Sequence, residues 1–123
     1  MTEIVKTDIA IIGAGPVGLF AVFELGLLDL QCHLIDILDK PGGQCSELYP
    51  EKPIYDIPAF PSITGQELTD NLLQQIKPFT PTYDFNTMVN GIKKVGTDEN
   101  GMGIYHVITD TDTIVECLSL IHI

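Results

Sequence analysis

The sequence is short of basic residues. It has 6 Lys and Arg against 17 Asp and Glu, which gives a formal net charge of −11. Nucleic acids and anionic membrane surfaces are polyanions, so a strongly acidic protein is repelled by both. We therefore expect neither nucleic acid nor a membrane among the partners of this chain.

A long apolar run is also missing. Glu24 and Asp29 interrupt the longest hydrophobic stretch, which stays well below the roughly 18 residues that a membrane-spanning helix needs. Residues 1–6 lack the charged-then-apolar pattern of a secretory signal. A length of 123 residues with 45% hydrophobic residues indicates one folded domain or part of one. Together these features predict a cytoplasmic protein.

The three cysteines include no C-x-x-C pair, and their spacing fits no metal-site pattern. Cys32 stands in an apolar segment and is expected to be a small core residue. Cys45 stands in a glycine-rich loop, where a redox or nucleophilic role is the less favoured interpretation. The histidines are scattered along the chain, so we predict no catalytic residue and no metal ligand.

The strongest pattern is a glycine fingerprint after an apolar run. Residues 8–12 predict a strand that is buried on both faces. Gly13, Gly15 and Gly18 follow at the G-x-G-x-x-G spacing, and a helix is expected from about residue 15 to 28. In this pattern the first glycine permits the tight turn, the second admits a pyrophosphate, and the third lets helix and strand pack closely. The N-terminus of the helix favours an anion.

A second strand and an acid complete the fingerprint. Residues 32–36 form another apolar run, and it ends at Asp36. A carboxylate roughly 20 residues after the glycines is the position that binds the ribose of an adenosine. The alternative, that Asp36 only ends a strand at the surface, accounts for none of the other matches. The sequence therefore predicts a dinucleotide-binding α/β fold.

Further elements follow in order. Residues 41–43 predict a turn whose two adjacent glycines allow the backbone to lie against a ligand. Residues 50–61 hold four prolines and are expected to form a packed, ordered loop. Thr64 and Glu67 predict a capping box at the start of a helix. This helix carries an apolar stripe of Leu68, Leu72, Leu73 and Ile76.

The last third of the chain predicts three short antiparallel strands, at residues 87–95, 103–109 and 113–118. We therefore expect a Rossmann-like FAD-binding domain, with a parallel sheet, helices and a three-stranded antiparallel meander. Residues 1–117 form the N-terminal part of it. Residues 118–123 resemble a translated sequencing-adaptor end and are expected to be a non-native tail on a truncated reading frame. No strand is expected to follow the meander.

The quoted motifs resemble those of one family, the thioredoxin-reductase-like ferredoxin–NADP reductases, a group of homodimeric flavoproteins. The resemblance rests on Gly-Ala-Gly-Pro-Val-Gly, Asp36, Pro-Gly-Gly-Gln-Cys and the run from Leu48 to Pro58. It covers residues 1 to about 117, which is only the first third of such a chain. It implies FAD at this fingerprint, and NADPH at a second fingerprint that this chain lacks.

The resemblance also implies a role for individual residues. The FAD pyrophosphate would be held by Gly13, Gly15, Pro16, Val17 and Gly18, and the adenosine ribose by Asp36. Gly43, Gln44 and Tyr49 would lie toward the flavin, Asp56 along the FAD chain, and Val89 beside the adenine. A flat tyrosine face suits stacking, and a glutamine amide suits the polar atoms of a flavin or ribitol.

Two classes of function compete. The first is an NADPH-dependent flavoprotein reductase that passes electrons to ferredoxin or flavodoxin, with a disulfide reductase as its nearest rival. The second is a non-catalytic adenine-dinucleotide module, which is what this segment amounts to by itself. We expect the segment alone to be inactive and the full-length protein to be an enzyme and a homodimer.

Overall fold

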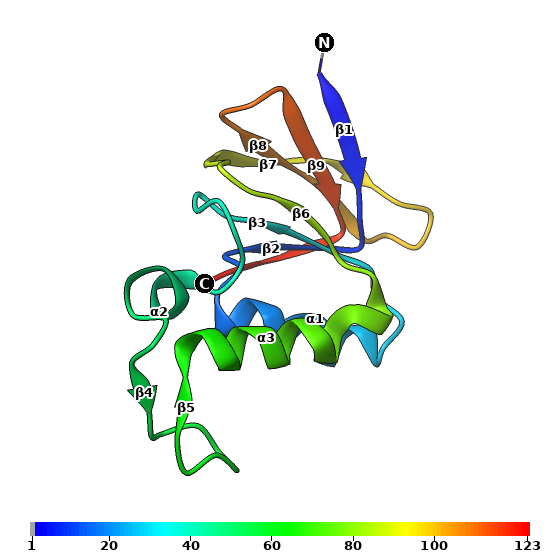
Figure 1. The fold of residues 1–123 in the computed structure, drawn as a ribbon. Helices are drawn as coiled ribbons and strands as arrows, with labels where there is room; N and C mark the ends of the chain where they lie inside the picture. Colours follow the sequence, from blue (N-terminus) through cyan, green and yellow to red (C-terminus); the bar gives the residue numbers. More distant parts are fainter. Residues whose placement is uncertain (1) are drawn as a thin grey trace.

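The computed structural model of this protein describes residues 2–123 and has three layers (Figure 1). Helices lie on one face of a central parallel sheet, and a second sheet lies on its other face. The elements are β1 (Glu3–Lys6), β2 (Ile9–Ile12), α1 (Pro16–Gly26), β3 (Cys32–Ile35), α2 (Gly43–Leu48), β4 (Pro53–Ile54), β5 (Ile63–Thr64), α3 (Gly65–Ile76), the 3-10 helix η1 (Lys77–Phe79), β6 (Thr82–Asp84), β7 (Val89–Thr97), β8 (Gly103–Thr109), β9 (Thr113–Cys117) and β10 (Ser119–His122).

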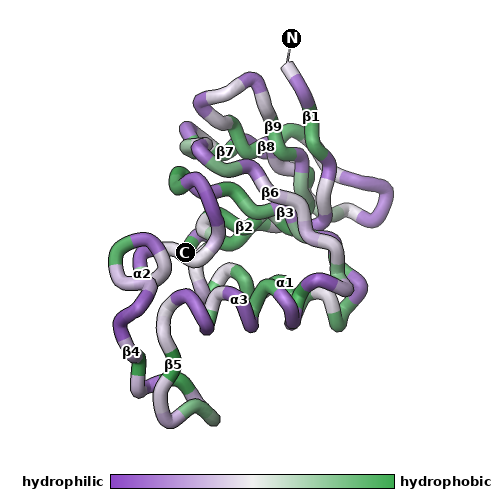
Figure 2. The backbone as a smooth tube through the Cα atoms, in the orientation of Figure 1, coloured by the Kyte–Doolittle hydropathy of each residue, from purple (hydrophilic) through white to green (hydrophobic). Residues whose placement is uncertain are grey.

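The central sheet has the strand order β10-β2-β3-β6, and its strands are parallel. Ile9 pairs with Cys32 and Ile12 with Ile35, in the register that two neighbouring apolar runs allow. Figure 2 shows β2 and β3 largely in green, the colour of hydrophobic residues. Burial on both faces explains why neither run alternates with polar residues. Both predicted strands are confirmed.

Helices α1 and α3 cover one face of this sheet side by side (Figure 1). The capping box is confirmed: the Thr64 hydroxyl accepts from the Glu67 amide at 3.1 Å, and Glu67 Oε1 accepts from the Thr64 amide at 3.2 Å. The predicted stripe also faces the core, with Leu68, Leu72 and Ile76 buried against α1 and β2. Burial of that stripe holds α3 on the sheet.

The predicted meander is confirmed and forms the second sheet, with strand order β1-β9-β8-β7. Val107 and Val115 are fully buried and meet Ala10 and Ile35 of the central sheet. Strand β1, which was not predicted, pairs in parallel with β9 and forms one edge. Its four residues are too few to show a hydrophobic pattern from which its pairing with β9 could be predicted.

Two expectations were wrong. The proline-rich residues 50–61 are ordered but mostly exposed rather than packed, because they extend from the body around the short β4–β5 pair (Figure 1). A strand does follow the meander: β10 pairs in parallel with β2, since Leu120 and Ile121 pack on opposite faces of the sheet. Whether residues 118–123 are native is a separate question, and their assignment as a tail stays a prediction. Helix α2 was also not foreseen, because the adjacent Gly42 and Gly43 indicate a turn.

The burial of two thiols generates a test of the fold. Burial, with the nearby Asp8 carboxylate, raises the pKa of the Cys32 thiol to about 11, and burial likewise raises the pKa of Cys117. Cys45 is exposed. At pH 8 under native conditions, iodoacetamide should therefore alkylate one thiol per chain, because the other two are buried and stay protonated. Intact-mass spectrometry counts the adducts.

The matched control is Cys45→Ser, which should take up no label until denaturant is added and two thereafter. Rapid native labelling of that variant would show that Cys32 or Cys117 is accessible and that these parts of the two sheets are not packed as described.

Candidate functional site

The candidate site lies at the carboxyl ends of the parallel strands, where open α/β sheets bind ligands. A cavity of about 220 Å³ opens there. Three of the predicted residues line it together: Gly13 after β2, Asp36 after β3, and Val89 at the start of β7. Ile123 also reaches this cavity, and its Cβ lies 3.5 Å from the place of a Cβ on Gly13. The structure thus brings together one residue predicted for the pyrophosphate, Gly13, with those predicted for the ribose and the adenine, Asp36 and Val89.

The turn from β2 into α1 has the geometry that the glycine pattern predicts. Gly13 has a φ of +119°, a conformation that side chains rarely adopt. A Cβ on Gly18 would collide with the Gly13 carbonyl oxygen, so only glycine lets the helix approach the strand this closely. Helix α1 begins at Pro16 without a side-chain cap and without an acidic residue in its first turn. Its N-terminal amides are therefore available to an anion.

Asp36 ties this turn to the end of β3. Its Oδ2 accepts from the Ala14 amide at 2.8 Å, and its Oδ1 accepts from the Leu38 amide at 3.0 Å. Such charge-assisted bonds are stronger than neutral ones. Each carboxylate oxygen retains capacity for another donor, such as a ribose hydroxyl. Sequence reasoning placed the acid correctly but missed that it also holds the glycine turn.

A second glycine turn lies against the first. The Gly42 amide donates to the Ala14 carbonyl at 2.9 Å. Gly43 has a φ of +66°, and a Cβ there would lie 3.0 Å from Gly15 Cα. The two segments therefore meet through bare backbone, which is the kind of surface a phosphate can approach closely. Gln44 follows as an exposed residue in α2.

Two further predicted residues lie elsewhere. Tyr49 and Asp56 share the lining of a cavity of about 350 Å³, together with Cys45 and Lys52. The Tyr49 side chain is 58% exposed, and Lys52 Nζ lies 5.2 Å from the centre of its ring. This cavity shares no lining residue with the one at Asp36. Pro16 and Val17 line a third cavity, of about 630 Å³, so the predicted residues do not share one cavity.

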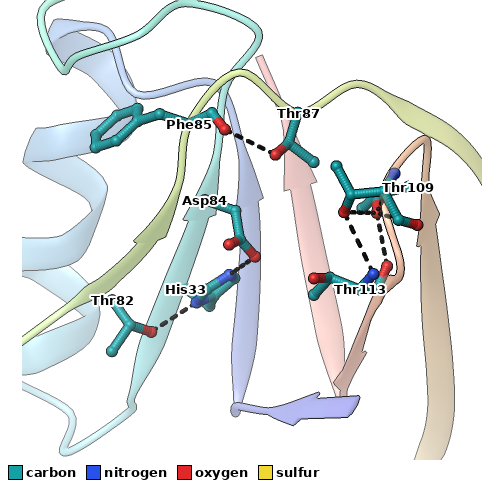
Figure 3. Close-up of polar contacts among 8 residues, drawn as sticks. His33, Thr82, Asp84, Phe85, Thr87, Thr109 and Thr113 are labelled. Atoms are coloured by element: carbon teal, nitrogen blue, oxygen red, sulfur yellow. Dashed lines mark hydrogen bonds and ion pairs between the residues drawn. The ribbon is translucent and has the colours of Figure 1, made fainter. Parts of the chain in front are cut away.

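One polar cluster near the site was not predicted to be functional. His33 of β3 is buried and contacts Thr82 and Asp84 of β6 (Figure 3). The sequence signal for this cluster is a histidine inside an apolar run. Thr82 and Asp84 are two positions apart and therefore lie on one face of a later strand.

Within residues 2–123, no group of three or more His, Cys, Asp or Glu side chains is arranged to hold a metal ion. None of the helices described for those residues has the length and apolar character that crossing a membrane requires.

A parallel sheet, a glycine turn into a helix, and an acid at the end of the next strand define a dinucleotide-binding domain of the Rossmann type. The chain belongs to the NAD(P)-binding Rossmann-like domain family, whose model matches residues 11–73.

The chain is also similar to curated ferredoxin–NADP reductases, which confirms the resemblance seen in its motifs. It is 61% identical over 117 residues to that of Bradyrhizobium sp. (strain ORS 278) and 62% identical over 117 residues to that of Nitrobacter winogradskyi. Each match covers 95% of this chain and 33% of the relative, so the chain spans about a third of their length. Lactococcus lactis thioredoxin reductase has a similar fold, with a TM-score of 0.76 and 25% identity over 95% of this chain and 35% of its own.

The close approach of α1 to β2 predicts the effect of a single methyl group. Gly18→Ala should destabilise the fold by roughly 1–3 kcal/mol, because the new Cβ would displace the Gly13 carbonyl oxygen. Urea unfolding followed by circular dichroism measures the change.

Gly91→Ala in β7 is the matched control, since nothing lies within 4 Å of a Cβ at that position. It should change the free energy of unfolding by less than about 0.5 kcal/mol. Equal effects of the two substitutions would contradict the described contact between helix and turn.

Proposed function

We propose that this chain is the FAD-binding portion of a flavoprotein that transfers electrons from NADPH to ferredoxin or flavodoxin. The observation that carries the proposal is the contact between the two glycine turns, with Asp36 fixing the first of them. The names of the similar reductases support the same activity. The matched family is a NAD(P)-binding one, but FAD and NAD(P) share an adenosine diphosphate half, and that half is the part we propose these residues bind.

The residues present fit FAD. Neither Gly15 nor Gly43 carries a Cβ, so the two turns lie in backbone contact, and the uncapped α1 N-terminus complements the pyrophosphate. In the proposal, Gly13, Gly15, Pro16, Val17 and Gly18 hold the pyrophosphate, Asp36 binds the ribose, and Val89 lies beside the adenine. Gly43, Gln44 and Tyr49 lie toward the flavin, and Asp56 lies along the chain of the cofactor.

FAD, when bound, supplies the hydride and single-electron chemistry, and the protein supplies binding, orientation and electrostatics. Tyr49 offers an exposed aromatic face for stacking. We assign no side chain of this chain to proton transfer. NADPH binding and homodimer contacts are proposed for the portion of the protein outside these residues, and the protein is proposed to be cytoplasmic.

A disulfide reductase is the second candidate, since the thioredoxin reductase of Lactococcus lactis shares the fold. Among residues 2–123, no two cysteines have the C-x-x-C spacing, and Cys32 and Cys117 are buried. A disulfide centre would therefore have to lie elsewhere in the protein. A non-catalytic dinucleotide-binding module is the third candidate for the segment in isolation.

The role of Asp36 gives the first test of this function. In the full-length protein, Asp36→Ala should weaken FAD binding by about 10- to 100-fold, because a charge-assisted hydrogen bond contributes roughly 1.5–3 kcal/mol. Flavin fluorescence after dilution or dialysis measures how much FAD is retained.

Asp39→Ala is the matched control, since it removes the same charge from an exposed position on the same loop. It should retain FAD as the unmodified protein does. Because Asp36 also binds the Ala14 and Leu38 amides, circular dichroism must show both variants folded. Undiminished flavin retention in folded Asp36→Ala would refute the assignment.

The electron acceptor gives the second test. The full-length enzyme, supplied with NADPH, should reduce ferredoxin or flavodoxin faster than it reduces oxidised thioredoxin. This expectation rests on the run from Leu48 to Pro58, which matches ferredoxin reductases better than thioredoxin reductases. Stopped-flow absorbance of each acceptor measures the two rates.

The salt dependence of the rate of ferredoxin or flavodoxin reduction provides the control, because the net charge of −11 would repel an acidic carrier. If basic residues outside this segment form the docking patch, the rate should fall as salt screens charges beyond roughly 10 Å at 0.1 M. Turnover of thioredoxin alone would show that the protein is a disulfide reductase.

A further inference from the structure

His33 lies in the parallel sheet among apolar neighbours, yet both of its ring nitrogens have polar partners. The residue is 2% exposed. Its Nε2 lies 2.8 Å from Asp84 Oδ2 and its Nδ1 lies 2.6 Å from Thr82 Oγ1 (Figure 3). An ionised carboxylate only accepts, so Nε2 donates to Asp84. One side chain of β3 thus holds both ends of β6.

Strand β6 needs such a clamp. It has only three residues and forms an edge of the sheet, so among residues 2–123 β3 is its only strand neighbour. Three backbone pairs give such a strand little stability of its own, whereas a buried histidine with two partners fixes its position along β3.

The position of β6 reaches the candidate site through backbone bonds. The Asp36 amide donates to the Asp84 carbonyl at 3.0 Å, and the Thr87 amide donates to the Asp36 carbonyl at 3.0 Å. Asp36 in turn accepts from the Ala14 amide of the glycine turn. Thr87 and Val89, which follow β6, line the same cavity as Asp36.

We propose that His33 is a positioning residue for the adenosine end of the dinucleotide site. By clamping Thr82 and Asp84, it fixes β6, and the Asp84 carbonyl of β6 fixes the backbone of Asp36. This inference rests on the proposed function, because it assumes that the cavity at Asp36 receives the adenosine of FAD. A purely structural role would instead stabilise the whole fold without any special link to Asp36.

A double-mutant cycle in the full-length protein separates these roles. FAD dissociation constants are measured by fluorescence for His33→Leu in the unmodified and in the Asp36→Ala backgrounds, together with urea unfolding of every variant. We expect His33→Leu to raise the dissociation constant about tenfold in the first background and less than about twofold in the second, since residues that act through one group are not additive.

His106→Leu is the matched control, because His106 makes a similar contact with Glu116, at 3.0 Å, on the meander and away from the site. It should leave the FAD dissociation constant unchanged within about twofold. If His33→Leu does not fold, Thr82→Val removes one partner of the clamp alone and takes its place in the cycle, with a smaller expected rise of about threefold.

An equal increase in both Asp36 backgrounds, or no increase in a folded His33→Leu protein that still binds FAD, would overturn the positioning role. Failure of the unmodified full-length protein to bind FAD would instead overturn the proposed function itself and the inference with it.

Discussion

The contact between Gly18 and the carbonyl of Gly13 is the constraint on which the rest of this structure depends. It lets α1 lie directly on β2, so that the first helical amides point to the edge of the sheet where the strands end. Any side chain at Gly18 would force helix and strand apart. The site therefore depends first on a steric requirement, that position 18 carries no side chain at this contact.

Hydrogen bonds then fix the edge that this contact creates. Asp36 holds the Ala14 amide, and the Ala14 carbonyl accepts from Gly42 in the second glycine turn. One carboxylate thus connects the end of β3 with two turns that are separate in the sequence. Bonds of this kind at a partly buried edge are stronger than at an open surface, which suits a site that must be formed before its ligand arrives.

The sequence predicted the elements whose pattern is local. The apolar runs of β2 and β3, the capping box at Thr64 and the turns of the meander each depend on a few neighbouring residues, and each is confirmed. Helix α2 and strand β1 escaped prediction because they are short and depend on tertiary partners. The exposure of residues 50–61 also escaped it, since apolar composition does not say which surface a loop meets.

The candidate site also contains some features that follow from a local sequence pattern and others that depend on tertiary contacts. Gly13 and Asp36 were selected from the sequence pattern and meet in one cavity, because the carboxyl ends of parallel strands share an edge. Val89, which the family resemblance indicated, lines the same cavity from the start of β7. The contact of Gly43 with Gly15 and the clamp at His33 join residues that are distant in sequence, so no spacing rule could reveal them. Tyr49 and Asp56 line a separate cavity, and sequence alone gave no way to see that separation.

We propose that the two glycine turns and Asp36 together receive the adenosine diphosphate half of FAD. A crystal structure of the full-length protein with FAD would test this. In it, the pyrophosphate should lie against Gly15 and Gly43 at the start of α1, with the adenosine ribose on Asp36. An FAD molecule bound away from the carboxyl edge of this sheet, or NADP in place of FAD at this first fingerprint, would contradict it.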